Sequence, residues 1–526
     1  MLTSVAAAIL TLASASAAAS PPERSAVQDT SLKARVDTWR ARREGVILRE
    51  LVELLAIPNV ARDSANIRRN AALLITMLER RGVRARILEA PGSSPAVYGE
   101  LAVPGATRTV VFYSHYDGQP VDTARWTTPP WKPVLRDRAL TAGGREIPLP
   151  PPDGRVDPES RLYARSASDD KAPIVAMLTA LDAMRELGVR PSVNLKFFFE
   201  GEEEAGSPRL REMLTRHAEL LRADLWIFGD GPVHQSRKHL VSFGVRGVMG
   251  VHLTVYGPAR PLHSGHYGNW APNPNVMMAH LLASVRDEEG HIRIAGFYDD
   301  VRPFSPAQRA ALAAFPPVEA QLIGELRLGR TEGGSAPLAE RVSLPGLNVS
   351  GVSGGRTGAA AANLIVPEAT AYIDFRLVPD QRPDRVRTLL EAHLRAQGYH
   401  VVREDPDSAT RRAHPRIVKV LSEGGYPATG TDLELPVSRA VIRAAEGAMG
   451  EPMILEPPMG GSLPLYHFEE VLRTPLVMLP IVNHDNNQHA ENENLRIRNL
   501  WDGIALYAGV LARLEAEWRR AERPVP

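Results

Sequence analysis

Several short stretches of the sequence carry acidic and imidazole side chains of the kind that bind divalent metal ions. These side chains are His115, Asp117, Asp169, Glu203, Glu204, Asp230 and His489. If they gather in one pocket, their carboxylates repel one another, and such an arrangement is costly without cations. Two divalent metal ions would neutralise it. A mixture of imidazole and carboxylate ligands suits zinc, and manganese and cobalt become alternatives as oxygen ligands accumulate.

Each stretch also has an ordinary explanation when it is taken alone. His115 and Asp117 fit a turn at the end of a strand, Ser168 or Asp169 fits a helix N-cap, and the acidic run at 200–204 fits a solvated loop. The hypothesis of a metal site therefore depends on the stretches occurring together. It also requires one carboxylate that binds no metal and acts as a base.

The elements that must position these residues are buried strands. Nearly continuous apolar runs at 109–115, 192–200 and 223–230 each end in polar residues, and they alternate with helical periodicity at 45–57, 65–82 and 172–188. This alternation favours the α/β class, with a central sheet flanked by helices. Ligands of such sheets bind beyond the carboxyl ends of the strands, which is where the candidate residues stand.

The pattern changes near residue 246. Alternating strands at 247–257 and 369–379, each followed by a helical run, predict a smaller α+β unit inserted into the first domain. We expect one catalytic domain made of two segments, 20–245 and 415–526, with the inserted domain at 246–414 between them. The Pro-rich segment at 136–160 is expected on the surface, where it either shapes the entrance to the site or decorates the exterior.

Composition excludes several other classes of protein. The chain has 526 residues and a net charge of +1, without a basic stripe suited to nucleic acid. It has no cysteine, which excludes disulfides, cysteine–zinc sites and thiol catalysis. Residues 1–19 resemble a secretory signal peptide without its positive n-region; a frayed Ala-rich tail and a mis-chosen start codon are the alternatives. We therefore expect export to the periplasm or the medium, and a mature form without a membrane span.

The ordered motifs resemble those of the M20 family of metallopeptidases, and within it the carnosinase-like dipeptidases. The matching stretches are "YSHYDGQP" (113–120), "ARSASDDKAP" (164–173), "FEGEEEAGS" (199–207), "GD" (229–230), "LHSGHYGN" (262–269), "DFRLVP" (374–379), "GGSLP" (460–464) and "HAENENL" (489–495). The resemblance implies that the inserted unit is a ferredoxin-like lid and dimerisation domain, and that the protein is a homodimer.

The resemblance also implies a role for each residue of the site. His115 and Asp230 would bind one metal, Glu204 and His489 the other, and Asp169 would bridge the two. Asp117 would orient the ring of His115. Glu203 would be the general base, taking a proton from the water between the metals and delivering it to the departing amine. Of the remaining acids in the run, Glu200 and Glu202 are interpreted as bystanders, and Glu202 is expected to be exposed.

A second set of residues is implied to hold the substrate. His263 would reach the substrate carbonyl oxygen, either in its own chain or in the partner's site; a strand-end turn is its ordinary explanation. Arg376 would bind the terminal carboxylate with Gly461 and Ser462, unless it forms a structural ion pair. Asn363 and Tyr426 complete the set. Tyr426 stands where many of these dipeptidases have a histidine, which puts dipeptide specificity in doubt.

The leading hypothesis is a two-metal hydrolase that cleaves the amide bond of short peptides, with dipeptides as the expected substrates. A close alternative keeps the mechanism and hydrolyses N-acyl or N-carbamoyl amino acids. A remote alternative is a non-catalytic binding protein on the same fold.

Overall fold

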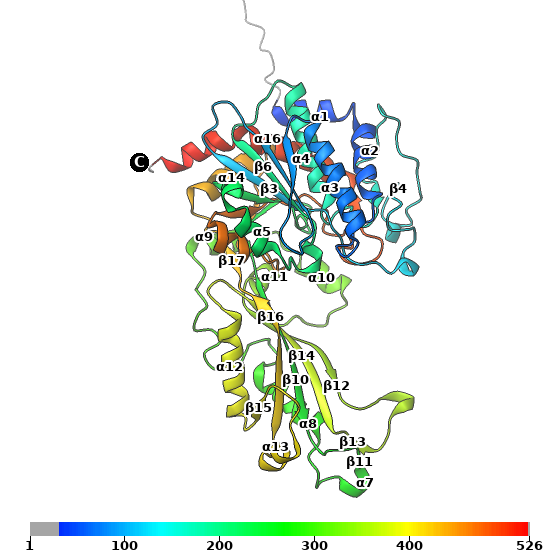
Figure 1. Cartoon of the computed structure of the whole chain (residues 1–526), viewed down its shortest axis with the longest axis vertical. Helices are drawn as coiled ribbons and strands as arrows, with labels where there is room; N and C mark the ends of the chain where they lie inside the picture. Colours follow the sequence, from blue (N-terminus) through cyan, green and yellow to red (C-terminus); the bar gives the residue numbers. More distant parts are fainter. Residues whose placement is uncertain (1–30, 524–526) are drawn as a thin grey trace, which may run out of the picture.

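The computed structural model describes residues 31–523, which form a large layered unit and a narrower second unit extending from it (Figure 1). The expected signal peptide, residues 1–19, lies outside these described residues. Among the helices in the range 31–523, none is both long enough and apolar enough to span a bilayer.

An eight-stranded mixed sheet forms the centre of the large unit. Its strands lie in the order β1-β2-β6-β3-β7-β19-β8-β18. Their bounds are β1 (Arg84–Leu88), β2 (Ala96–Leu101), β3 (Thr109–His115), β6 (Asn194–Glu200), β7 (Leu225–Phe228), β8 (Leu240–Ser242), β18 (Ile454–Glu456) and β19 (Leu476–Met478). β3 is parallel to both β6 and β7, whereas β2 is antiparallel to β6.

Helices cover both faces of this sheet. One face carries α1 (Leu32–Arg40), α2 (Glu44–Leu55), α3 (Ser64–Glu79), α4 (Lys171–Glu186), α14 (Pro436–Met449) and α16 (Ile497–Glu522), and the other carries α5 (Leu210–Arg216), α6 (Ala218–Leu221) and α15 (Tyr466–Leu472). The phenylalanines of β6 show the two layers, because Phe197 and Phe199 belong to the first core and Phe198 to the second. The predicted α/β sheet flanked by helices is confirmed.

The second unit is built on a five-stranded sheet with the order β12-β14-β10-β16-β15. Its strands are β10 (Gly247–Tyr256), β12 (Gly346–Ser353), β14 (Glu368–Leu377), β15 (His400–Val402) and β16 (Ile417–Tyr426). Helices α8 (Pro274–Val285) and α12 (Pro383–Ala396) pack on one face, against alternate residues of β10 from Met249 to Val255. β16 lies beyond the expected boundary at residue 414, so the second unit extends further along the chain than the sequence predicts.

Two small pairs of strands lie at opposite ends of the second unit. At the junction with the large unit, β9 (Gly244–Val245) pairs with β17 (Thr429–Gly430). At the far end, β11 (Leu262–His263) pairs with β13 (Leu364–Ile365), next to α7 (Ser264–Tyr267) (Figure 1).

A long connection between α8 and β12 returns toward the large unit. It contains α9 (Pro306–Ala313), α10 (Glu319–Glu325) and α11 (Leu338–Val342), which Figure 1 shows at the lower end of the large unit. A capping box of Ser305 and Gln308 begins α9. Ala311 joins the core of the large unit, so this connection is anchored there.

The Pro-rich segment lies between β4 (Val134–Arg136) and β5 (Arg161–Tyr163), which form a small sheet with β20 (Asn494–Arg496). It packs on α2, where the backbone N–H of Val156 donates to Glu44 at 2.8 Å. No residue of 136–160 lines the cavity described below. The segment therefore packs on the exterior of the large unit and does not line that cavity.

Candidate active site

Strand ends of the large sheet bring the predicted metal-binding residues together. His115 is the last residue of β3, Asp230 follows β7, and Glu203 and Glu204 open a short 3-10 helix (Glu203–Ala205) that follows β6. Asp169 stands just before α4. His489 lies in the loop between β19 and β20. The expectation that ligands gather beyond the carboxyl ends of these strands agrees with this placement.

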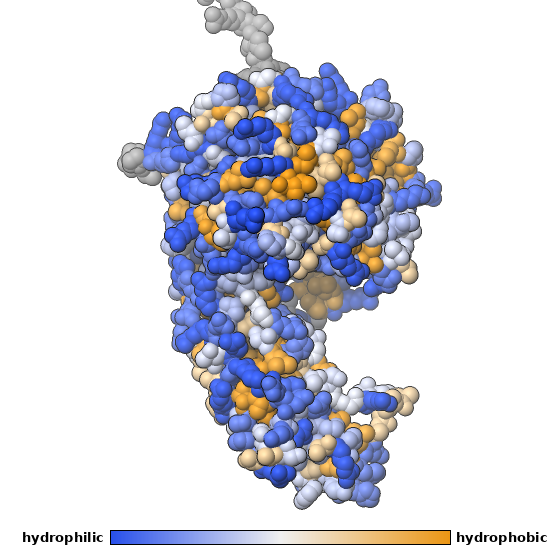
Figure 2. Space-filling view, in the orientation of Figure 1, coloured by the Kyte–Doolittle hydropathy of each residue, from blue (hydrophilic) through white to orange (hydrophobic). Residues whose placement is uncertain are grey.

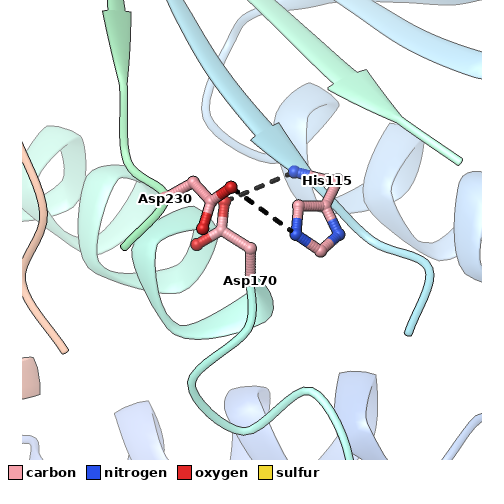
Figure 3. Close-up of side chains that lie close together, drawn as sticks. All are labelled: His115, Asp170 and Asp230. Atoms are coloured by element: carbon pink, nitrogen blue, oxygen red, sulfur yellow. Dashed lines mark hydrogen bonds and ion pairs between the residues drawn. The ribbon is translucent and has the colours of Figure 1, made fainter. Parts of the chain in front are cut away.

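Two adjacent groups of side chains have the geometry of metal ligands. In the first, His115, Asp170 and Asp230 each offer a ligand atom, and these atoms all lie within 4.8 Å of one another (Figure 3). In the second, Asp169, Glu204 and His489 meet the same condition. The donor set of each group is imidazole and carboxylate, as zinc and similar divalent ions require.

Asp169 lies between the two groups. Its Oδ1 is 2.9 Å from Nε2 of His115, and its Oδ2 is 3.1 Å from Nε2 of His489. One carboxylate thus faces an imidazole from each group, which is the position that a bridging ligand must occupy.

Asp170 was not recognised as a candidate ligand in the sequence, where the ordinary explanation of this stretch was a helix N-cap at Ser168 or Asp169. Its side chain is fully buried and its Oδ1 has no hydrogen-bond partner within residues 31–523. Burial, followed by the charge of Asp230, raises the pKa of Asp170 well above its usual range. A buried carboxylate oxygen that accepts no hydrogen bond is costly unless a cation neutralises it. The residues present therefore suit divalent metal ions.

Asp117 orients the ring of His115 and the turn at Glu203 and Glu204. Its Oδ1 lies 3.4 Å from Nδ1 of His115, and its two carboxylate oxygens accept the backbone N–H groups of Glu203 and Glu204 at 3.1 and 3.0 Å. The same buried carboxylate therefore holds a ligand ring on one strand and the Glu203–Glu204 turn that follows the next.

Glu203 is placed where a base would be. Its Oε2 is 3.9 Å from Nε2 of His115, and its side chain is 12% exposed. Burial raises the pKa of Glu203 well above that of a free glutamate. Burial, followed by the charge of Asp169, also raises the pKa of Glu204 to about 8. Burial is the larger cause of both shifts, and the neighbouring carboxylates add to it, so bound cations would lower both pKa values.

The other two acids of the run are buried, which corrects the expectation that Glu202 is exposed. Glu202 accepts the backbone N–H groups of Ser94 and Arg209 at 2.8 and 3.2 Å, and Glu200 accepts the hydroxyl of Tyr113 at 2.8 Å. Both acids thus fix the backbone around the site.

Glu493 is a second residue that the sequence did not reveal. It is fully buried and accepts the backbone N–H groups of Ser166, Ser168 and Asp169, each at 2.9 Å. Nη1 of Arg165 donates to it at 2.8 Å. The only signal was its place in "HAENENL", four residues after a ligand.

A cavity of about 860 Å³ joins the metal-binding residues to part of the substrate set. It is lined by Asp169, Glu203, Glu204, Asp230 and His489 together with Tyr426, Gly461 and Ser462. Nη1 of Arg376 donates to Oγ of Ser462 at 2.9 Å, and Nε of Arg376 lies 3.4 Å from Asp374. Arg376 is therefore both ion-paired and adjacent to the cavity.

His263 and Asn363 are not part of this cavity. They lie at the far end of the second unit, where the carbonyl oxygen of Asn363 accepts the N–H of Ser264 at 3.0 Å (Figure 1). The pairing of β11 with β13 fixes them there. Asn363, expected in the set that holds the substrate with Arg376, therefore does not line the cavity of the described chain.

A mixed sheet with two groups of imidazole and carboxylate ligands at its strand ends defines a metallohydrolase. The family described as peptidase family M20/M25/M40 matches residues 111–513, and the chain belongs to this family. It is thus a hydrolase of peptide amide bonds, and the alternative of a non-catalytic binding protein is not better supported.

Known proteins of this family resemble the chain over most of its length. It is 26% identical to the Cys-Gly metallodipeptidase of Schizosaccharomyces pombe, over 78% of this chain and 81% of that protein. It is also 26% identical to the human Beta-Ala-His dipeptidase, over 79% of this chain and 76% of that protein. The crystal structure of an M20 family metallo-carboxypeptidase from Sulfolobus solfataricus superposes with a TM-score of 0.71 at 26% identity, covering 89% of this chain and 99% of that one.

The comparisons correct the expectation of export. The names of the Cys-Gly metallodipeptidases and Beta-Ala-His dipeptidases that match the chain describe no exported enzyme. An Ala-rich start without a positive n-region was too weak a pattern for that prediction.

Proposed function

We propose that this protein is a dipeptidase that works with two divalent metal ions per subunit, zinc being the first choice and manganese or cobalt the alternatives. The observation that carries the proposal is a cavity lined by members of both groups of metal-binding side chains together with Ser462 and Tyr426. Asp230 comes from the first group, and Asp169, Glu204 and His489 from the second. A cavity of this kind holds the scissile bond of a short peptide near the metals and its terminal carboxylate near Arg376.

The ligands divide between the two ions. His115 and Asp230 would hold one, Glu204 and His489 the other, and Asp169 would be shared, with the carboxylate of Asp170 adjacent to the first. When bound, such a pair of ions lowers the pKa of a water molecule and polarises the scissile carbonyl. Asp117 keeps the ring of His115 in place for this purpose.

Glu203 would move the proton. Its carboxylate, close to His115 but outside both ligand groups, takes a proton from the attacking water and donates it to the leaving amine. Burial raises its pKa, which favours its holding that proton between the two steps.

The substrate carboxylate would be held by Arg376, by the hydroxyl of Ser462 and by the backbone at Gly461. The guanidinium fork suits a carboxylate, and Ser462 already accepts one of its N–H groups. Tyr426 contributes a neutral hydroxyl, since burial and the charge of Glu203 raise the pKa of Tyr426 to about 12.

His263 and Asn363 would act across a homodimer. His263 is exposed at the end of the second unit farthest from its own cavity, so a partner subunit is the means by which an imidazole reaches the substrate carbonyl oxygen.

The test is a substrate panel with zinc and manganese supplied separately. A set of dipeptides should be hydrolysed, whereas N-acetyl and N-carbamoyl amino acids should be cleaved far more slowly. Activity confined to the N-acyl or N-carbamoyl compounds would overturn the dipeptidase proposal and leave the two-metal mechanism standing.

A further inference from the structure

The catalytic cavity continues past the metal-binding residues to a wall that the connection between α8 and β12 supplies. Leu312, Phe315 and Val318 come from α9 and the turn after it, and Leu338 and Val342 from α11. Met459, from the loop after β18, completes this wall. We call these six residues the apolar wall.

Hydrogen bonds hold the two parts of the connection that form the wall, around α9 and α11, at fixed positions relative to each other. The carboxylate of Glu319 accepts the backbone N–H of Val318 at 3.1 Å and that of Leu338 at 2.9 Å. These two bonds tie the start of α10 to the start of α11. The two helical parts of the wall are therefore joined by hydrogen bonds.

The wall is also fixed to the large unit. The ring of Phe315 meets the ring of His234 edge to face, with centroids 5.7 Å apart. α9 contacts β18, and Ala311 is buried in the main core. The position of Phe315 relative to the metal-binding residues is thus set by the large sheet.

The chemistry of the cavity lining favours an apolar ligand group. No lysine or arginine is among the described residues that line it. Leu312, Phe315, Val342 and Met459 are half-buried and Leu338 is exposed, so each retains surface that an apolar side chain would cover. Removing such surface from water is favourable. Glu319 and Glu456 also line the cavity, but the carboxylate of Glu319 already accepts two backbone N–H groups.

We propose that the apolar wall selects substrates carrying a large apolar side chain, such as leucine or phenylalanine, over those with glycine, β-alanine or a charged residue. This proposal rests on the proposed hydrolysis of short peptides and specifies the class of peptide that the cavity accepts. The preferred substrates would then differ from the Cys-Gly and β-Ala-His dipeptides named for the relatives.

The experiment compares kcat/KM for Gly-Gly, Leu-Gly, Gly-Leu, Phe-Gly and β-Ala-His in the metal-loaded enzyme and in Phe315→Ala and Leu338→Ala. For the unmodified enzyme, kcat/KM should be higher for at least one of the leucine or phenylalanine peptides than for Gly-Gly. Each variant should reduce the ratio of kcat/KM for the apolar peptide to kcat/KM for Gly-Gly by roughly 10- to 100-fold.

The matched control is Leu326→Ala. Leu326 belongs to the same connection, just after α10, and is 62% exposed, but it does not line the cavity. Figure 2 shows hydrophobic surface at the lower end of the large unit, where Figure 1 places α10 and α11. The control should keep the full preference for the apolar peptide. An equal loss on Gly-Gly and on the apolar peptide, or a preference of the unmodified enzyme for Gly-Gly, would overturn the proposal.

A second series separates this proposal from the proposed function. N-acetyl-leucine and N-acetyl-glycine are assayed with the same variants. If only these compounds are hydrolysed, the dipeptidase proposal fails, yet the ratio of leucine to glycine and its loss in Phe315→Ala still decide whether the wall selects apolar side chains. A leucine-to-glycine ratio near one in both series would overturn only the proposal that the apolar wall selects apolar side chains.

Discussion

The carboxylate of Glu493 accepts the backbone N–H of Asp169 at 2.9 Å, whereas two histidines face the side chain of that same aspartate. The residue placed between the two ligand groups is thus held through its backbone by a buried acid. That acid is itself neutralised by Arg165, whose guanidinium lies 5.1 Å from the ring centroid of Trp126.

Replacing Glu493 by glutamine should weaken metal binding without touching a ligand. The amide has one acceptor oxygen for three N–H groups and leaves Arg165 buried without its charged partner. We expect metal affinity to fall by about 10- to 100-fold, and the free energy of unfolding to fall by about 3 to 5 kcal/mol. Zinc titration and urea unfolding measure the two effects. Glu491→Gln, in an exposed pair with Arg125, is the matched control and should change neither.

Replacing Glu203 by glutamine should abolish proton transfer and keep the metals. The change is nearly isosteric, and Glu203 belongs to neither ligand group. We expect kcat to fall by about 10²- to 10⁴-fold, with metal content unchanged by elemental analysis. Glu212→Gln, an exposed glutamate of α5, controls for the loss of a charge. Retained activity at full metal occupancy would remove Glu203 from its assigned role.

The metal-free protein should lose stability as the pH rises. Burial raises the pKa of Glu204 to about 8 and that of Asp230 to about 6, and the hydrogen bond to Asp169 raises the pKa of His489 to about 9. The folded state then binds more protons than the unfolded one, so this stabilisation is full at acid pH and is lost as the pH rises through these values.

Bound metal should reverse that trend, because it binds the deprotonated ligands. The difference in Tm between the zinc-loaded and the chelated protein should therefore widen from about pH 5 to about pH 9. Thermal scans at several pH values measure it. A constant difference across this range would argue against a cluster of mutually repelling carboxylates.

Mixing two inactive variants should restore activity if His263 serves the partner's site. Neither Glu203→Gln nor His263→Ala has an intact site as a homodimer, whereas a mixed dimer has one. An equal mixture should recover about one quarter of the normal activity, since half of the dimers are mixed and each has one working site of two. If activity does not recover although subunit exchange has been verified, His263 does not act in the partner's site.

The sequence predicted the centre of the site because several independent signals converge there. The strands ending at His115, near Glu203 and before Asp230 are apolar on both faces, which single-sequence patterns reveal well. The roles of Asp170 and Glu493 were missed because both depend on contacts between distant segments. Nothing in the spacing of "HAENENL" indicates that its second glutamate reaches the turn before α4.

The second unit was predicted less completely. β16 begins with an alternating pattern at Ile417 and then becomes polar, with two glycines before Tyr426, so its strand character was hidden. The connection that forms the apolar wall has three short helices and many prolines. Its return to the large unit depends on the contacts of Ala311 and Phe315 with that unit rather than on any periodic pattern.

The hydrogen bond between Arg376 and Ser462 spans the two units, because Arg376 belongs to β14 and Ser462 to the loop between β18 and α15. A rotation of the second unit away from the first would separate these two groups. If Arg376 and Ser462 hold a substrate's carboxylate as proposed, binding of that carboxylate requires the two units to keep their present angle, and β9 pairs with β17 at the junction between them.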